Sequence, residues 1–420
     1  MLFWSGTSCY LVVKILNMVV GEIGLVLTVL SLVVWVGLLS IRGQFWRLDQ
    51  RLDAQVTESP VLSSVCAIIP ARNEANLLPV TLRSLLQQDY PGCFTTILVD
   101  DHSDDETAAV AQSVADASDK PSQLHVLSAQ ALPPGWTGKL WAIEQGIRQA
   151  QTFTPPPDYF LLTDADIEHD AGNLRQLVAK AQQEDLDLVS LMVRLRCESF
   201  WEQLLIPAFV FFFQKLYPFR WVNDPNKAIA AAAGGCILIS GEALTRIGGI
   251  QAVRQALIDD CALAHAVKSS GQPSGKGRIW LGLSNSTRSL RPYPSLATIW
   301  EMVARTAFTQ LNYSPWLLLG TLMGMTLVYV VPPVSAVVGV LIGNWLIAIA
   351  GLSTWLLMAY AYLPTIQFYR CSPLLAFCLP LIAFIYTLMT LDSAVRHWQK
   401  RGGTWKGRVY SETLVNSSSD

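Results

Sequence analysis

The sequence predicts an α/β domain with a mainly parallel sheet, held at a membrane by one apolar helix before it and two or three after it. Charged residues make up only 15% of the chain, against roughly 25% in soluble domains. Nearly all of them lie between about residues 60 and 305. In that region short apolar runs alternate with amphipathic stretches, which is typical of βαβ units.

The N-terminal region is predicted to be a membrane anchor. Residues 23–41 carry no charge, and their length is close to the roughly 20 residues that cross a bilayer as a helix. A cleavable signal peptide is the alternative, but no A-x-A-like site follows. The basic residues after the run, Arg42, Arg47 and Arg51, favour a cytoplasmic position for the next domain. We therefore expect residues 1–59 to be an anchor and linker.

Residues 60–305 are expected to form the catalytic domain. Its candidate strands are 65–70, 95–100, 124–128, 159–164, 186–193 and 235–240. Candidate helices lie at 75–88, 104–117, 139–150 and 171–184. The strands are apolar on both faces, so we expect helices to cover a mainly parallel sheet. Ligands bind such sheets at the carboxyl ends of the strands.

The C-terminal region, residues 306–395, is expected to hold membrane helices. No residue from 306 to 369 is charged, which predicts two helices broken near Pro332 and Pro333, and a third follows at 373–391. Three crossings would put the basic tail, residues 396–420, outside, whereas the positive-inside rule favours the inside. One apolar segment is therefore expected to be interfacial or re-entrant.

Residues 200–219 are aromatic-rich and have two interpretations of equal weight. They form either a helix at the headgroup level or a buried helix of the catalytic domain.

Composition argues against several other classes of protein. A net charge of −2 provides no basic field for nucleic acid. The eight cysteines show no C-x-x-C pair or zinc spacing, and they fit a reducing compartment. Five scattered histidines do not indicate a metal cluster.

Carboxylates follow two of the predicted strands. Asp100 and Asp101 end the strand at 95–100, and two adjacent carboxylates there repel one another unless something binds them. Residues 103–105, which follow, are more simply explained as turn and helix-cap residues than as ligands. Asp164 and Asp166 form a D-x-D after a buried strand, and both can reach one hard divalent ion.

Asp259 and Asp260 precede a predicted helix and act either as helix caps or as a general base. Lys139 opens another predicted helix, where a cation and free N–H groups suit a phosphate, although a lone Lys is more often a solvated surface residue. The glycines at 234–235 permit turns or close backbone approach, and no G-x-G-x-x-G fingerprint is present.

The ordered series PARNE, VDDHSDDET, GWTGK, TDADI, GGCILIS, IDDCALA and WKGR resembles family 2 inverting glycosyltransferases with a GT-A nucleotide-sugar-binding domain. The resemblance covers about residues 60–305. More narrowly, TDADIEH, the 188–219 segment and IWEMVARTAFTQLNYS resemble the hopene-associated glycosyltransferases of bacterial hopanoid gene clusters.

The resemblance implies roles for the residues that match the family motifs. Asp100 and Asp101 would hold the nucleoside. PARNE would line the same pocket with Pro70, Ala71, Asn73 and, chiefly, Glu74. Asp166, assisted by Asp164, would bind the Mg²⁺ or Mn²⁺ that bridges the diphosphate. Asp260 would be the catalytic base, with Asp259 standing where the family usually has Glu.

The clearest departure from the family is at its Q-x-x-R-W motif. Residues 302–306 align there and keep only Arg305. Processive synthases use the missing Gln and Trp to hold a growing glycan, so a single transfer is favoured. Arg305 then either pairs with diphosphate or anchors the chain at the membrane interface.

The expected function is transfer of one sugar from a nucleotide-diphosphate sugar to a lipid hydroxyl, in hopanoid biosynthesis, at the inner membrane with the catalytic domain in the cytoplasm. A carotenoid, a polyprenyl phosphate or a glycerolipid are alternative acceptors. An inactive membrane scaffold is an alternative of another class. A transporter is disfavoured, because the apolar stretches after residue 306 lack the ionisable groups of a transport pathway.

Overall fold

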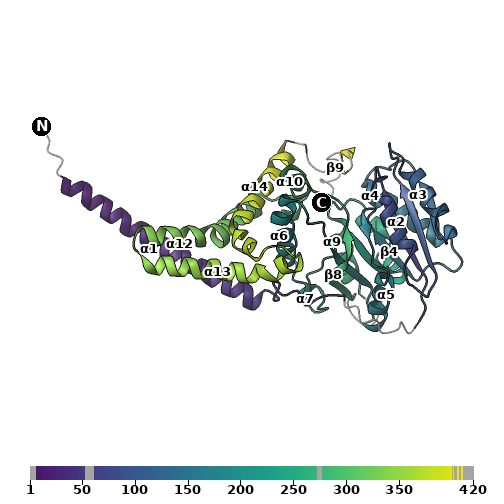
Figure 1. Cartoon of the computed structure of the whole chain (residues 1–420), viewed down its shortest axis with the longest axis horizontal. Coiled ribbons are helices and arrows are strands. Elements are labelled where there is room, and N and C mark those ends of the chain that lie inside the picture. Colours follow the sequence, from purple (N-terminus) through teal and green to yellow (C-terminus); the bar gives the residue numbers. More distant parts are fainter. Residues whose placement is uncertain are drawn as a thin grey trace.

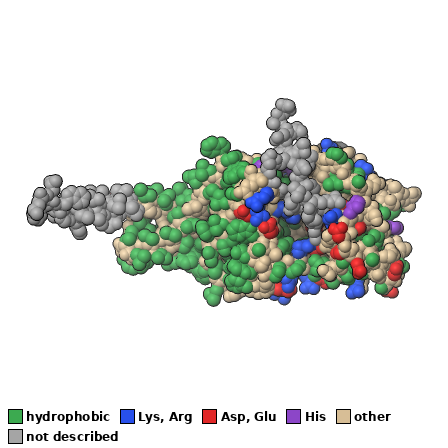
Figure 2. All heavy atoms as spheres, turned by 90° about the horizontal axis from the view of Figure 1, so that it is seen from above, with side chains coloured by type: hydrophobic (Ala, Val, Ile, Leu, Met, Phe, Trp, Pro, Cys, Tyr) green, Lys and Arg blue, Asp and Glu red, His purple; other side chains and the backbone are tan. Residues whose placement is uncertain are grey.

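The molecule is elongated, with a sheet domain at one end and an apolar helical bundle at the other (Figure 1). The structure is a computed structural model that describes residues 6–52, 61–271, 277–399, 401, 404–405 and 408–409. Apolar side chains cover most of the bundle end, and charged side chains gather on the sheet end (Figure 2).

The described residues of the sheet domain include one eight-stranded sheet in the order β3-β2-β1-β4-β7-β6-β8-β5. Its strands are β1 (Val65–Ala71), β2 (Phe94–Asp100), β3 (Leu124–Ser128), β4 (Tyr159–Thr163), β5 (Ile167–Glu168), β6 (Leu188–Arg194), β7 (Cys236–Ser240) and β8 (Ile279–Ser289). Neighbours are parallel except around β7, which is antiparallel to β4 and β6, and at β5, which is antiparallel to β8. The predicted mainly parallel sheet is confirmed.

All six predicted strands form, but β8 was not predicted. Its first half, residues 279–283, is a buried apolar run, whereas Asn285, Ser286 and Arg288 in its second half are exposed. Pairing with β6 holds it in the sheet. The omission matters, because β8 carries residues into the site described below.

Helices cover both faces of the sheet. They are α2 (Leu78–Leu86), α3 (Thr107–Asp116), α4 (Gly138–Gln151), α5 (Asn173–Gln183), α8 (Gly241–Arg246) and α9 (Asp259–Ser269). Successive residues of a strand point to opposite faces. Ile68 of β1 accordingly packs in the core that holds Ile143 of α4, and Ile69 packs in the core that holds Leu82 of α2. Each core fixes one face of the central strands.

Four helical segments among the described residues are long and apolar enough to span a bilayer: Gly21–Ile41, Pro315–Leu341, Trp345–Phe368 and Pro373–Trp398. The first segment is part of α1 (Gly6–Ile41). The second consists of α11 (Pro315–Met325), a π-helical turn (Thr326–Val330) and α12 (Val331–Leu341). The third is α13 (Trp345–Phe368), and the fourth consists of a 3₁₀ turn (Pro373–Cys378) and α14 (Leu379–Trp398).

The expected break near Pro332 and Pro333 is wrong. Both prolines lie in the first turn of α12, where a missing N–H is tolerated. The chain instead reverses at Gly343, whose φ of 70° suits glycine, and the Asn344 side chain caps α13.

The last apolar segment contacts the catalytic domain near both of its ends. Just before it, the carbonyl of Tyr369 accepts a hydrogen bond from Arg194. The segment then runs back along α13, where Trp355 donates to the carbonyl of Phe377 at 3.1 Å. At its far end Arg396 forms a bidentate ion pair with Glu301 at 2.6 and 2.8 Å. The chain therefore enters the bundle and returns to the side on which it started.

Helices α6 (Phe200–Leu216), α7 (Phe219–Val222) and α10 (Leu296–Ala304) join the two ends of the molecule. A capping box between Ser199 and Glu202 starts α6. Its buried side packs against the bundle, with the ring of Phe211 5.1 Å from Tyr362 and that of Phe212 5.1 Å from Tyr386. Of the two interpretations of residues 200–219, this packing favours the buried helix, which lies beneath the apolar bundle.

The predicted tail, residues 396–420, is described only in part. Thr404–Trp405 (β9) and Arg408–Val409 (β10) pair as a short antiparallel ribbon, and most of the remaining tail lies outside the described residues. So do residues 53–60, which include the predicted boundary between anchor and catalytic domain.

Candidate functional site

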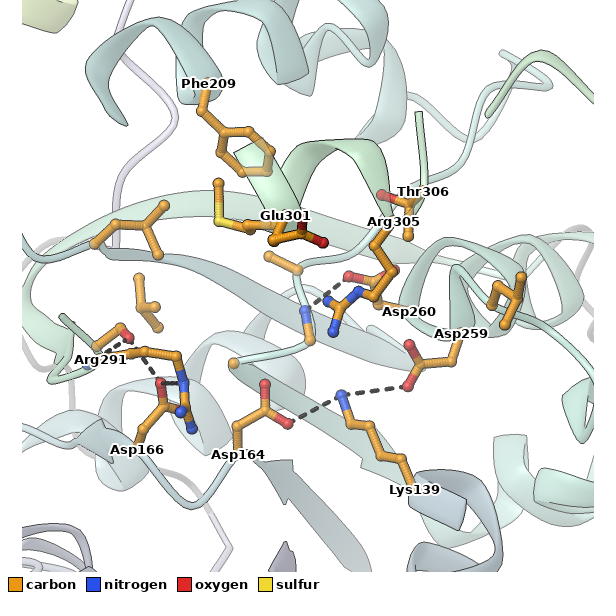
Figure 3. Close-up of a pocket in the computed structure, with 18 of the residues that line it drawn as sticks. Lys139, Asp164, Asp166, Phe209, Asp259, Asp260, Arg291, Glu301, Arg305 and Thr306 are labelled. Carbon is orange, nitrogen blue, oxygen red and sulfur yellow. Dashed lines mark hydrogen bonds and ion pairs between the residues drawn. The ribbon is translucent and has the colours of Figure 1, made fainter. Parts of the chain in front are cut away.

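A cavity of about 550 Å³ opens at the carboxyl ends of β1, β4 and β6, between the sheet and helices α6 and α10 (Figure 3). Six carboxylates line it, namely Glu74, Asp164, Asp166, Asp259, Asp260 and Glu301. Five basic side chains line it as well, namely Lys139, Arg291, Arg305, Arg396 and Arg401. This is the edge at which parallel sheets bind ligands.

Lys139 links two of the carboxylate pairs that the sequence singled out. Thr137 caps α4 and so sets Lys139 in its first turn. The Nζ atom lies 2.9 Å from Oδ1 of Asp164 and 3.3 Å from Oδ2 of Asp259. Burial alone would lower the pKa of Lys139, but the two carboxylates outweigh it and raise the pKa above its usual range. Lys139 is thus a fixed cation between the D-A-D segment and α9.

Asp166 is held from the opposite side by residues that the sequence analysis did not single out. Its Oδ2 accepts hydrogen bonds from Ser289 Oγ at 3.0 Å and from Arg291 Nε at 3.1 Å. The same guanidinium donates through Nη2 to Glu74. Arg291 therefore joins the PARNE segment to the D-A-D segment. Recognising β8 would have placed it at this edge.

Asp260 is oriented by the backbone. Its Oδ2 accepts from the N–H of Gly234 at 2.9 Å and its Oδ1 from the N–H of Cys261 at 2.8 Å. The N-cap of α9 is Ile258, so Asp260 does not hold the cap position that the sequence left open. Burial, followed by repulsion from Asp259, raises the pKa of Asp260 to about 6, although Lys139 opposes the rise.

Gly234 makes room for this arrangement. A Cβ atom built there would lie 3.3 Å from Lys139 Nζ and 3.5 Å from Asp260 Oδ2. The first glycine of GGCILIS thus permits the close backbone approach that the sequence suggested.

Arg305 ends α10 and projects into the cavity (Figure 3). Among the described residues, no carboxylate lies within ion-pairing distance of its guanidinium. Its charge is therefore available to an anionic ligand.

Four of the predicted site residues lie outside the lining of the cavity: Ala71, Asn73, Asp100 and Asp101. They occupy the ends of β1 and β2, where the two following loops are locked together. Asn73 Oδ1 accepts from the N–H of Asp104 at 2.8 Å, and Asp100 accepts from Ser103. The side chain of Asp101 is buried beside Arg72. Their role toward a nucleoside stays a prediction.

The D-A-D carboxylates fit a divalent ion by the chemistry of their donor atoms. Asp164 and Asp166 each use one oxygen for a protein cation, and both line the cavity. The described residues contain no cluster of three or more His, Cys, Asp or Glu side chains that would hold a metal alone. Mg²⁺ or Mn²⁺ would therefore take further ligands from water and a substrate diphosphate, as hard ions commonly do.

His169, close to the D-A-D segment, belongs to the core instead. It hydrogen-bonds with Thr163 and Asn173, and burial lowers its pKa to about 3.

Comparison with known proteins agrees with this architecture. Residues 66–248 match the family Glycosyl transferase family 2. No curated protein matches the chain in sequence. The structure resembles a mannosyltransferase of Pyrobaculum calidifontis in complex with GDP-Man and Mn²⁺, with a TM-score of 0.51 and 18% identity over 90% of this chain and 99% of that one.

More distant likenesses include the mannosyl-3-phosphoglycerate synthase of Rubrobacter xylanophilus, with a TM-score of 0.39 and 16% identity over 65% of this chain and 85% of that one. TarS of S. aureus has a TM-score of 0.39 and 16% identity over 59% of this chain and 40% of that one. The comparisons therefore show a match to Glycosyl transferase family 2 over residues 66–248, within a sheet domain that has the GT-A fold.

Proposed function

We propose that this protein is a membrane-bound glycosyltransferase that moves one sugar, with inversion, from a nucleotide-diphosphate sugar to a lipid hydroxyl. One observation carries the proposal. Asp260 and the D-A-D carboxylates line the same cavity, where Lys139 pairs with Asp164 and Asp259, beneath helices that pack on the apolar bundle.

Asp260 is the proposed base. Two backbone N–H groups orient its carboxylate toward the cavity, and a pKa of about 6 leaves it mostly ionised at neutral pH yet basic enough to accept a proton. It would take the proton of the acceptor hydroxyl as that oxygen attacks the anomeric carbon from the face opposite the diphosphate. Inversion follows from a single displacement, without a covalent enzyme intermediate.

The other groups would bind the departing diphosphate. Asp164 and Asp166 would hold Mg²⁺ or Mn²⁺, which supplies Lewis-acid stabilisation of charge on the leaving group. Arg305 would add a guanidinium able to bind phosphate oxygens bidentately. Ser289 and Arg291 fix one oxygen of Asp166 and so orient the other.

The membrane arrangement follows from the return of the last apolar segment. Three crossings, by α1, by α11 with α12, and by α13, would leave the catalytic domain and the basic tail on one side of the bilayer. A re-entrant segment 373–398 resolves the conflict between three C-terminal crossings and the positive-inside rule. We place that shared side in the cytoplasm, where nucleotide sugars are made.

The proposed acceptor is a hopanoid, and this part rests on the resemblance of the segments 163–169, 188–219 and 299–314 to hopene-associated glycosyltransferases. Single transfer is favoured because residues 302–306 keep only the arginine of the motif that holds a growing glycan.

Lipid analysis of cells tests the proposal. Cells that lack the gene and cells that carry Asp260→Asn should both lose a glycosylated lipid and accumulate its unglycosylated precursor. Asp119→Asn, a carboxylate change on the exposed surface, is the matched control and should leave the lipids unchanged. A change in the deletion strain alone would support a scaffolding role, and no change in either would remove the hopanoid assignment.

A further inference from the structure

The cavity has two chemically different walls. One part of its lining carries the carboxylates and cations described above, whereas the part that faces α6 is apolar. This apolar wall consists of Phe209 and Phe213 of α6, Met192 and Leu195 of β6 and its C-terminal end, and Met302 of α10. Figure 3 shows the ring of Phe209 pointing into the cavity from the side opposite Asp164 and Asp166.

The apolar wall is continuous with the bundle. Phe209 and Phe213 are four residues apart on α6 and so share one face of that helix. The next face carries Phe211 and Phe212, whose rings pack on Tyr362 of α13 and Tyr386 of α14. The apolar lining of the cavity and the contacts with the bundle therefore lie on neighbouring faces of one helix, and an apolar ligand bound against Phe209 would lie close to the bundle.

The proposed base favours a hydroxyl as the acceptor group. A hydroxyl carries a proton that a base must remove, which is the role proposed for Asp260, while a phosphate monoester is largely deprotonated at neutral pH.

We infer that Phe209, Phe213 and Met302 form an acceptor subsite for an uncharged lipid alcohol. The inference rests on the proposed glycosyl transfer and deepens it by naming the class of acceptor. It separates a lipid alcohol from a polyprenyl phosphate, which the sequence left as an alternative.

Purified full-length enzyme in lipid nanodiscs tests the inference. The donors are UDP-glucose, UDP-N-acetylglucosamine and GDP-mannose. The acceptors are a triterpenoid alcohol and a polyprenyl phosphate at equal mole fraction, and the readouts are nucleoside diphosphate release and the glycolipid mass. We expect transfer to the alcohol.

Phe209→Ser should raise the KM for the alcohol about tenfold to a hundredfold relative to the donor KM, as loss of a buried aromatic contact predicts. Phe209→Leu should recover most of this loss, which separates an apolar contact from misfolding. Phe200→Ser is the matched control on the same helix, because Phe200 is 67% exposed and does not line the cavity.

The outcomes distinguish the two proposals. Transfer to polyprenyl phosphate but not to the alcohol would overturn the inference and leave glycosyl transfer standing. Use of the alcohol with the same KM in Phe209→Ser and Phe200→Ser would overturn the subsite. Failure to release nucleoside diphosphate with every donor and acceptor would overturn the proposed function, and the inference with it.

Discussion

Asp259→Asn should move the acid limb of the pH-rate profile to lower pH. Asp260 can accept a proton only when ionised, so activity is lost as the pH falls through its pKa of about 6. Asp259 is the largest cause of this raised pKa after burial. The rise from 3.8 to about 6 corresponds to about 3 kcal/mol in favour of the protonated form. Removal of one neighbouring charge should reverse part of it, lowering the pKa by about 0.5 to 1.

The assay is kcat/KM for sugar transfer from acid to neutral pH, in nanodiscs, with Asp119→Asn as the surface control. Asp259 also pairs with Lys139, and release of that cation would lower the pKa of Asp260 further, so both effects have the same sign. An acid limb that stays in place or moves to higher pH in Asp259→Asn would refute the assignment of Asp260 as the titrating base.

Three further changes probe the rest of the arrangement. Lys139→Met should move the acid limb to higher pH, because Lys139 lowers the pKa of Asp260; a move to lower pH would contradict the geometry. Gly234→Ala should lower kcat about threefold to tenfold with little change in Tm, because the new methyl group would contact Lys139 and Asp260 and small misplacements are costly to catalysis. An unchanged kcat would argue against the close approach of the Gly234 backbone to these two side chains. The Sγ atoms of Cys197 and Cys371 lie 3.6 Å apart, so diamide, which accepts two electrons and two protons from the thiols, should form an intramolecular disulfide that peptide mass spectrometry detects. Its absence would argue against the docking of the catalytic domain on the bundle.

The regular pattern of the chain made most of the fold predictable. Five of the six strands that were expected are buried on both faces or nearly so, which leaves a clear apolar run in the sequence, and the sixth, β3, lies at one edge of the sheet. The segment that became β8 exposes Asn285 and Arg288, so its strand character depends on pairing with β6, which local sequence does not show.

The carboxylates of the site were predictable because they directly follow apolar strands or open a helix. The residues that pair with these carboxylates could not be predicted. Arg291 reaches Asp166 across 125 positions of sequence, and Lys139 joins Asp164 to Asp259 only because α4 and α9 meet at one edge of the sheet. Such contacts depend on tertiary packing rather than on any motif.

The course of the C-terminal segment shows the same limit of prediction from sequence. Hydropathy marks residues 373–398 as a span, since length and apolar composition are all that it measures. The contacts of Phe377 with α13 and of Arg396 with α10 are instead the basis for the proposed re-entrant course. The positive-inside rule, which favours the basic tail on the side of the catalytic domain, is consistent with these contacts.

The most direct test of the central claim is the anomeric configuration of the product together with its dependence on Asp260. Purified enzyme in nanodiscs receives a nucleotide sugar of known anomer and the lipid acceptor, and NMR of the glycolipid gives the configuration. The predicted result is inverted product from the wild type and a rate at least about a hundredfold lower from Asp260→Asn. Retained configuration, or an Asp260→Asn variant as active as the wild type, would contradict the account.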